Sequence, residues 1–529
     1  MALQPIGYSY LVGEYGLPVR PLPICAVIDS GVRGRESRRQ GNQQIFVFQP
    51  NYRPKDSLAG HLQFALRYEG VNLKVLALLF QQSGKADLEQ WLTDKSTSAY
   101  ARRAGYLYEW LTGGRLAEEA VSGIPERANY VRLLDPELQF EAPDGERDSR
   151  FRIINNLTGN RDFCPLVRRT PYLQESIERD LRTRIHETLA RYDEDLLRRA
   201  AGYLYLKETQ SSFEVEREKP SPNRAQRFAD LLRQADTGEP LTEKRLAELQ
   251  QAVIDPRFHE FTWRSQQNWI GRDHGYRKQV DFVPPRPEDV PDLMAGLLSL
   301  AERARAWPTS GEKRQRNKGK ENTEAADPVI AAAIIAFGFV FIHPFMDGNG
   351  RIHRYLIHDV LANAGFTPRG IILPVSAVIL AHLRDYVQVL EAFSRPLLAR
   401  TDYDPDTPKV PARGNDALYF RYFDATEQAE YLYRALERTV EEDLQREIDF
   451  LLGFDRAYRA LNGLLDWPGH SLDLFIRLVY QNEGKLSRTK REKHFDWMTD
   501  DEISEAEEMV VQAFDIRSNK TEQPNRETS

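Results

Sequence analysis

The chain has 529 residues, of which 41% are hydrophobic and 29% are charged, and its 72 Lys and Arg against 79 Asp and Glu give a formal net charge of -7. At roughly 100 to 200 residues per domain, this length predicts about three or four domains, and the apolar content excludes a wholly disordered chain. The acidic balance excludes a global cationic field for nucleic acid or an anionic membrane, so any phosphate-binding patch must be local.

The cysteine content and the apolar runs bear on the compartment. Two cysteines, Cys25 and Cys164, are too few for a disulfide framework or a Cys-rich zinc site, which suits a reducing environment. The N-terminal residues do not show the basic and then apolar regions of a signal peptide. The longest apolar run, 329–342, is shorter than the ~20 residues that a membrane-spanning helix needs. We therefore expect a cytoplasmic protein without a membrane partner.

The first 170 residues combine strand-like and helical patterns. The run IFVFQP at 45–50 is extended and apolar, and stretches with helical spacing follow it, so a small mixed domain is expected up to about residue 125. Two β-leaning fragments, 151–158 and 163–170, then flank the turn formers Gly159 and Asn160. This arrangement predicts a hairpin.

Helical patterns dominate the rest of the chain. Residues 176–210 carry apolar side chains at three- and four-residue spacing, which predicts one amphipathic helix. Two β-capable runs around a turn predict a hairpin at 267–283, which the following prolines end. The polar segment 311–322 is expected to be a mobile solvated loop. Helices return beyond 415, and the tail from about 516 is expected to be disordered.

The segment that carries chemistry joins two helical stretches. Residues 329–342 are almost entirely apolar, and the run HPFMDGNGRIHR follows at 343–354. Gly348, Asn349 and Gly350 are residue types that accept left-handed backbone geometry, so their N–H groups can converge in an anion-binding nest. Because the nest opens the second helix, the partial positive charge of that helix N-terminus favours a phosphate as the ligand.

Side chains beside the nest complete a site for phosphoryl or nucleotidyl transfer. Arg351 and Arg354 are three residues apart, so both guanidinium groups lie on one helix face and can hold further phosphates. Asp347 can bind a Mg²⁺ ion that bridges two phosphates, and it can also cap the helix. His343 can accept a proton near neutral pH and is the candidate general base. The P-loop motif GxxxxGK[ST] is absent from the chain, so the predicted site is of another design.

The run HPFMDGNGRIHR resembles the Fic-domain motif HPFx(D/E)GNGRxxR at every defining position, and the resemblance covers about residues 205–395. It implies a helical core that transfers AMP from ATP to a Tyr, Thr or Ser hydroxyl of a target protein and releases pyrophosphate. By position it implies His343 as the base and Asp347 as the Mg²⁺ ligand. It assigns the phosphates to Gly348, Asn349, Gly350, Arg351 and Arg354. Gly350 and Arg354 also distinguish the chain from the Doc-like branch, which phosphorylates its targets.

A second element of the resemblance lies upstream of the motif. Residues Ser212 to Glu216 resemble the inhibitory pattern (S/T)xxxE(G/N) of the same family. There the glutamate pairs with the second motif arginine, here Arg354, and displaces the γ-phosphate, as a bidentate carboxylate–guanidinium pair would. The departure is Arg217, which stands where Gly or Asn is usual and puts the local turn in question. A solvated glutamate in a charged run is the alternative interpretation of Glu216.

The hairpin at 267–283 resembles the family's flap, which aligns an extended segment of the target by strand addition. Its expected target-binding residues are Trp269, Ile270 and Gly271. The expected fold is therefore mainly α, with a Fic-type helical core, a small β-hairpin flap, a mixed α/β N-terminal domain and a helical C-terminal region. The expected divisions are 1–200, 201–400 for the catalytic core, 401–515 for the C-terminal helices and 516–529 for the tail.

The leading hypothesis is an ATP- and Mg²⁺-dependent protein adenylyltransferase that Glu216 inhibits. Alternatives within enzymes are a bifunctional or de-AMPylating enzyme and the use of another nucleotide donor. A different class is a nucleotide-sensing regulatory module with partner- or DNA-binding appendages, which the acidic net charge and the intact His343, Asp347 and Arg354 disfavour. The expected partners are ATP and a target protein, and nucleic acid is not expected. The target, its modified residue and the oligomeric state stay open, with a homo-oligomer among the alternatives.

Overall fold

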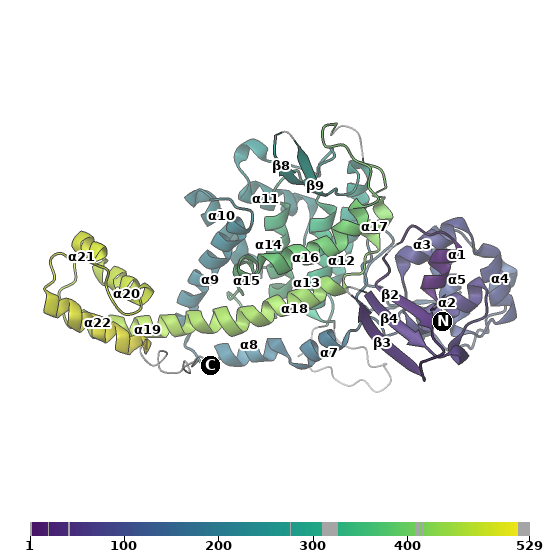
Figure 1. The fold of residues 1–529 in the computed structure, drawn as a ribbon, viewed down its shortest axis with the longest axis horizontal. Helices are drawn as coiled ribbons and strands as arrows, with labels where there is room; N and C mark the ends of the chain where they lie inside the picture. Colours follow the sequence, from purple (N-terminus) through teal and green to yellow (C-terminus); the bar gives the residue numbers. More distant parts are fainter. Residues whose placement is uncertain are drawn as a thin grey trace, which may run out of the picture.

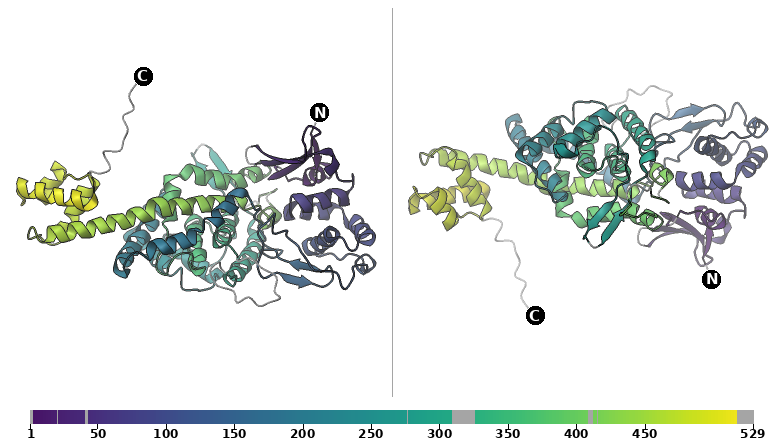
Figure 2. Two further views of the ribbon diagram at one scale, coloured as in Figure 1. Left: turned by 90° about the horizontal axis from the view of Figure 1, so that it is seen from below. Right: turned by 90° about the horizontal axis from the view of Figure 1, so that it is seen from above.

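A computed structural model describes residues 3–19, 21–40, 43–275, 277–308, 326–407, 412–414 and 416–516. The described chain is mainly helical with small sheets, which confirms the expected fold class. The molecule is elongated: a mixed α/β body holds the N-terminus, a helical body forms the centre, and the last helices lie at the far end of a long helix (Figures 1 and 2). No described helix combines the length and the apolar character needed to cross a membrane.

The N-terminal body packs helices beside a four-stranded sheet with the order β1-β2-β4-β3, in which β2 and β4 are parallel. The run IFVFQP supplies most of β4, as expected. The strands are β1 (Gln4–Ile6), β2 (Ile24–Ile28), β3 (Arg35–Gln40) and β4 (Gln43–Phe48). The helices are α1 (Tyr8–Glu14), α2 (Leu58–Tyr68), α3 (Leu73–Gln82), α4 (Lys85–Asp94), α5 (Ala99–Thr112) and α6 (Glu118–Val121).

The hairpin predicted around Gly159 and Asn160 is wrong. Strand β7 (Ile153–Asn155) pairs instead with β5 (Val131–Arg132) and β6 (Glu146–Asp148). Residues 163–168 form no strand, because their backbone bonds to a segment about 260 residues away: Cys164 N–H donates to Arg421 O at 2.8 Å, and Ala425 N–H donates to Leu166 O at 2.9 Å.

The single helix predicted for 176–210 is also wrong in its bounds. Three helices occupy this region: α7 (Pro171–Glu178), α8 (Leu181–Leu189) and α9 (Glu194–Val215). Asp180 and Asp193 interrupt the pattern, because each caps a new helix by accepting a hydrogen bond from a backbone N–H three residues on. Apolar spacing continues through both interruptions, so periodicity alone does not reveal them.

The central body surrounds α13 (Pro328–Ile342), whose side chains are almost all buried and which packs against α12, α14 and α18. Its hairpin, predicted at 267–283, forms as antiparallel β8 (Ile270–Asp273) and β9 (Lys278–Phe282). The other helices of this body are α10 (Pro222–Arg233), α11 (Glu243–Val253), α12 (Val290–Arg305), α14 (Asn349–Asn363), α15 (Val375–Ala381), α16 (Leu383–Leu398), α17 (Ala417–Arg421) and α18 (Thr426–Arg438). Short 3₁₀ turns lie at Pro50–Tyr52, Pro256–Phe258 and Pro287–Asp289.

A long continuous helix connects the central body to the C-terminal helices. A π-helical stretch (Thr439–Leu444) joins α18 to α19 (Gln445–Asn462) without a break. The last helices, α20 (Ser471–Gln481), α21 (Arg488–His494) and α22 (Asp500–Phe514), lie at the far end of this continuous helix (Figure 2). Residues of α20 and α22 share a hydrophobic cluster with the end of α19. The predicted loop at 311–322 lies outside the described residues, as does the predicted tail except for Ile516.

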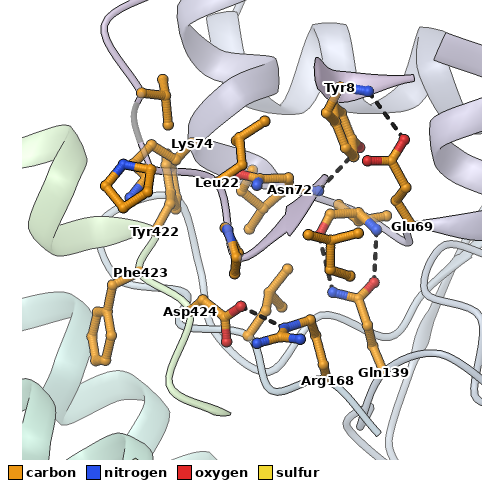
Figure 3. A pocket seen from close by; sticks show the side chains of 17 residues that line it. Tyr8, Leu22, Glu69, Asn72, Lys74, Gln139, Arg168, Tyr422, Phe423 and Asp424 are labelled. Carbon is orange, nitrogen blue, oxygen red and sulfur yellow. Dashed lines mark hydrogen bonds and ion pairs between the residues drawn. The ribbon is translucent and has the colours of Figure 1, made fainter. Parts of the chain in front are cut away.

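Polar contacts join the N-terminal body to the central one (Figure 3). Arg168 Nε donates to Asp424 Oδ2 at 2.7 Å, beside a cavity of about 50 Å³. On the other side of that cavity, Tyr8 N–H donates to Glu69, and burial raises the pKa of this carboxyl to about 8. The expected domain divisions stay a prediction, and α9 runs unbroken across the one drawn at residue 200.

Candidate functional site

The candidate site lies where α13 ends and α14 begins. His343 directly follows α13, in a left-handed conformation with φ 53, and its N–H donates to Phe339 O at 2.9 Å. Gly348 precedes α14 with φ 92, which a residue with a Cβ rarely adopts. These two positions reverse the chain within a short loop, so the histidine and the N-terminus of α14 belong to one site.

Asn349 holds this loop in shape. Its Oδ1 accepts from Phe345 N–H at 3.1 Å, its Nδ2 donates to Phe345 O at 2.8 Å, and the residue is buried. The Asn349 side chain is therefore engaged with the loop itself. Its predicted role in phosphate binding remains a prediction, as do those of the Gly348 and Gly350 amides.

The surroundings of His343 keep its imidazole neutral. The ring is half-buried and its Nδ1 lies 3.4 Å from Val340 O. Burial is the main cause that lowers the pKa of His343 to about 3, and the nearby positive charge of Arg264 acts in the same direction. A neutral imidazole can accept a proton, which is what a general base must do.

Arg264 is a structural partner of the loop that sequence reasoning missed. Its Nε donates to His343 O at 2.9 Å, and its backbone N–H donates to Pro344 O at 2.8 Å. A third bond, from Nη2 to Pro285 O at 2.5 Å, ties the loop to the base of the β8–β9 hairpin. Arg264 belongs to no motif and lies 79 residues before His343, so no sequence signal marked it.

The contact between Glu216 and Arg354 that the sequence predicts is formed. Arg354 is 1% exposed, and its Nη2 donates to Glu216 Oε1 at 2.9 Å. Ser212 completes the contact, because its hydroxyl accepts from Arg354 Nε at 2.8 Å and its carbonyl accepts from Nη2 at 2.7 Å. Helix α9 thus places both residues of the predicted pattern on one arginine.

Gly350 allows the glutamate to approach the first turn of α14. A Cβ at this position would lie 2.1 Å from Glu216 Oε1, which is closer than atoms can pack. The carboxylate therefore occupies space directly over the glycine that the sequence assigned to phosphate binding.

Arg351 has an acidic partner that sequence reasoning also missed. It is 3% exposed, and its Nη1 donates to Glu218 Oε2 at 2.5 Å. The other oxygen of Glu218 pairs with Arg224 Nη1 at 2.6 Å. Glu218 was hidden in the charged run EVEREK, where a solvated side chain is the ordinary expectation.

Comparison with known proteins agrees with this geometry: residues 240–361 match the family described as Fic/DOC. The chain contains a Fic domain. The protein adenylyltransferase fic-1 of Caenorhabditis elegans is 46% identical over 112 residues, which are 21% of this chain and 16% of that protein. The protein adenylyltransferase Fic of Nematostella vectensis is 35% identical over 88 residues, 17% of each chain. The chain thus matches under a quarter of the length of these relatives.

Two solved structures are also similar to the chain. A Fic family protein from Desulfovibrio desulfuricans G20 has 20% sequence identity and a TM-score of 0.34, covering 66% of this chain and 85% of its own. A Fic domain containing signaling protein from Bacteroides thetaiotaomicron has 20% identity and a TM-score of 0.33, covering 53% of this chain and 97% of its own.

The Fic domain offers a carboxylate suited to a magnesium ion. Asp347 is 63% exposed, and its Oδ1 accepts from Gly348 N–H at 2.6 Å and from Arg351 Nη2 at 3.2 Å. Oδ2 accepts no hydrogen bond from any residue in the described ranges. Mg²⁺ favours one or two carboxylates together with water and substrate phosphates, so an exposed oxygen beside the loop fits this ion.

The hairpin of the Fic domain presents an edge near the motif loop. All four residues of β8 are exposed, and Gly271 lies so close to β9 that a Cβ there would meet Gln279 O at 1.9 Å. Asn268 Nδ2, just before this strand, donates to Phe345 O at 3.2 Å. The expected flap residues Trp269, Ile270 and Gly271 are thus linked to the motif loop, and their binding of a target stays a prediction.

Proposed function

We propose that this chain is a protein adenylyltransferase that transfers AMP from ATP to a Tyr, Thr or Ser hydroxyl of a target protein and is inhibited by its own Glu216. One observation carries the proposal: a single short loop joins a neutral histidine to a helix N-terminus that bears two buried arginines. The relatives named protein adenylyltransferase support the reaction class.

In this proposal the protein supplies positioning and charge. The His343 imidazole accepts the proton of the target hydroxyl, whose oxygen then forms a bond to the α-phosphorus. The bond from that phosphorus to the β-phosphate oxygen breaks, and pyrophosphate leaves with its electron pair. The amides at the start of α14, with Arg351 and Arg354, stabilise the charge that develops on the phosphates. A Mg²⁺ ion held by Asp347 would neutralise phosphate charge when bound.

The inhibition follows from competition for one guanidinium group. Glu216 pairs with Arg354, and a carboxylate there excludes a phosphate from the same donors. Removal of the carboxylate leaves Arg354 held by Ser212 and frees its Nη2 side for the γ-phosphate. The uncovered edge of β8 is the proposed place where an extended target segment adds as a strand.

The test uses the Glu216→Gly variant, Mg²⁺, a host-cell lysate and ATP labelled at either the α- or the γ-phosphate. We expect the α-label, and not the γ-label, to be transferred to protein, and the transfer to disappear when His343→Ala is added. Transfer of the γ-label would instead establish phosphorylation. Absence of labelling with both forms would overturn the use of ATP and favour another nucleotide donor or the binding-module alternative.

A second candidate function is the removal of AMP from a modified protein. It is favoured by the geometry of Glu216, whose Oε1 pairs with Arg354 while the side chain stays 38% exposed and able to contact a water. Incubation of an AMP-labelled target with the wild-type chain and with Glu216→Gly tests it. Loss of label only with the wild type would support this candidate, and no loss with either form would exclude it.

A further inference from the structure

A cluster of three arginines lies beneath the C-terminus of α9. Arg351 and Arg354 come from the first turns of α14, and Arg224 comes from the start of α10. Arg224 is 12% exposed and belongs to none of the motifs. It shares two acceptors with Arg351: both donate to Val253 O, at 2.6 Å and 3.0 Å respectively, and both pair with Glu218.

The two guanidinium groups of Arg224 and Arg351 also share an apolar support. Their Cζ atoms lie 5.3 Å and 5.2 Å from the ring centre of Phe213, a fully buried residue of α9. Cation–π contact of this kind holds a guanidinium in place while leaving its in-plane N–H groups available for acceptors. The pair is therefore fixed as a unit rather than spread over a solvated surface.

The cluster has more donors than its protein partners use. Arg224 Nε, Arg351 Nε and Arg354 Nη1 are buried and find no acceptor in the described part of the chain. A buried donor without an acceptor costs free energy, and here each of the three arginines carries one. The carboxylates that pair with these arginines, Glu216, Glu218 and Asp347, leave those three N–H groups unused. Unused buried donors from three neighbouring guanidinium groups are what a binding site for a larger anion would offer.

We propose, resting on the function proposed above, that Arg224 is a third phosphate-binding arginine of the nucleotide site. In the same proposal Glu218, like Glu216, is a carboxylate that occupies arginine N–H groups in place of a phosphate. Glu216 pairs with Arg354, and Glu218 pairs with both Arg351 and Arg224. The turn that links the two glutamates places them on neighbouring arginines, so both carboxylates leave when the end of α9 moves. The three arginines, freed of these carboxylates, then bind the β- and γ-phosphates of a nucleoside triphosphate.

The experiment measures the dissociation constants of ATP and AMP by calorimetry on the full chain with Mg²⁺. In the Glu216→Gly background, adding Glu218→Gln is expected to tighten ATP binding about tenfold. The reason is that the Glu218 carboxylate no longer competes with the phosphates for the N–H groups of Arg224 and Arg351. Adding Arg224→Gln should reverse this gain, while Arg224→Lys should retain part of it. AMP, which lacks the outer phosphates, should bind equally to all of these forms.

Two control variants share the same helices without touching the cluster. Glu214→Gln lies on α9 and Arg227→Gln on α10; both residues are exposed, and neither change should alter ATP binding. If Glu218→Gln leaves ATP affinity unchanged, or if Arg224→Gln weakens ATP and AMP equally, the inference is overturned and the contacts are structural. If Glu216→Gly binds no ATP at all, the proposed function fails first.

Discussion

At the scale of single residues, the burial of His343 determines its chemistry. Its lowered pKa of about 3 means that the folded protein resists protonation of this ring, whereas the unfolded chain binds a proton near pH 6.5. His353 is fully buried, its Nδ1–H donates to Ala336 O at 2.8 Å, and burial also lowers its pKa to about 3. Both histidines therefore make the protein sensitive to acid.

This linkage predicts how stability depends on pH. Because the folded pKa values lie below the unfolded one, the stability contributed by the neutral rings is present above pH 6.5 and is lost as pH falls towards 3, by up to about 1.4 kcal/mol per pH unit for each histidine. The melting temperature of the central body, followed from pH 7 to pH 4.5, should fall less steeply in His343→Ala than in the wild type. Parallel curves for the two proteins would contradict the assigned shift.

The contact of Ser212 with Arg354 leads to a separate prediction about stability. Its hydroxyl is the acceptor of Arg354 Nε, and Ser212→Ala leaves this buried donor without a partner. The cost is expected to be about 1–3 kcal/mol of unfolding free energy. Ser211→Ala is the matched control, since that hydroxyl forms no hydrogen bond within the described ranges. Equal melting temperatures for the two variants would show that the Ser212 bond contributes nothing.

The residues of the site differ in how far sequence could identify them. His343 to Arg354 form one continuous motif, and Glu216 stands in a recognisable pattern. The contacts of Arg224, Glu218 and Arg264 come from segments that only the folded chain brings together, so no local pattern marks them. A charged side chain in a charged run is expected to be exposed to solvent. Only the tertiary structure shows that Glu218 pairs with two arginines.

At the scale of elements, the proposed inhibition depends on the turn that ends α9. Glu218 N–H donates to Phe213 O at 3.0 Å and Arg217 N–H donates to Glu214 O at 2.8 Å, which is a Schellman arrangement. Arg217 takes the left-handed position with φ 58. The turn therefore forms, although arginine stands here in place of the usual Gly or Asn. The upstream part of α9 is held by buried Glu208, which accepts from Ser376 N–H at 2.8 Å.

Arg217 therefore carries strain that glycine would relieve. Arg217→Gly is expected to stabilise the central body by about 1 kcal/mol, which is the cost of a left-handed conformation for a residue with a Cβ. The melting temperature should rise by about 2–4 °C for a body of this size. Arg217→Ala, which keeps the Cβ, is the control and should show no rise. A rise of the same size in both variants would mean that the arginine side chain, and not the backbone, is unfavourable.

Elements with strong local signals were predicted and those with distant partners were not. The apolar helix α13 and the β8–β9 hairpin follow from composition and turn residues within the segment. The segment 163–168 reads as a strand, but its partners lie near residues 421–425. The separation of α7, α8 and α9 depends on the helix caps Asp180 and Asp193. The helical spacing of apolar residues continues across both caps, so this spacing does not show where one helix ends and the next begins.

At the scale of the whole molecule, the last helices form a core of their own. Their hydrophobic cluster includes Phe475, Phe495 and Val510, and α19 connects it to the central body (Figure 1). The central cluster, by contrast, extends from Phe140 to Ile448 and includes the motif residue Phe345. A ligand at the candidate site should therefore stabilise the central body and leave the distal helices unaffected.

Differential scanning calorimetry tests this separation. We expect more than one unfolding transition, and ATP with Mg²⁺ added to Glu216→Gly should raise one transition by linkage while another stays in place. The same scan with AMP serves as a control for binding that lacks the outer phosphates. A single transition that moves as a whole would contradict independent cores.

The central claim is that a Fic domain capable of adenylyl transfer is held inactive by Glu216. The most direct measurement is the rate of α-labelled AMP incorporation by the wild type, Glu216→Gly and the matched control Glu214→Gly, which places the same substitution on the same helix away from Arg354. The account predicts labelling far above wild type for Glu216→Gly alone. Equal labelling by Glu216→Gly and the wild type, or an equal gain with Glu214→Gly, would contradict it.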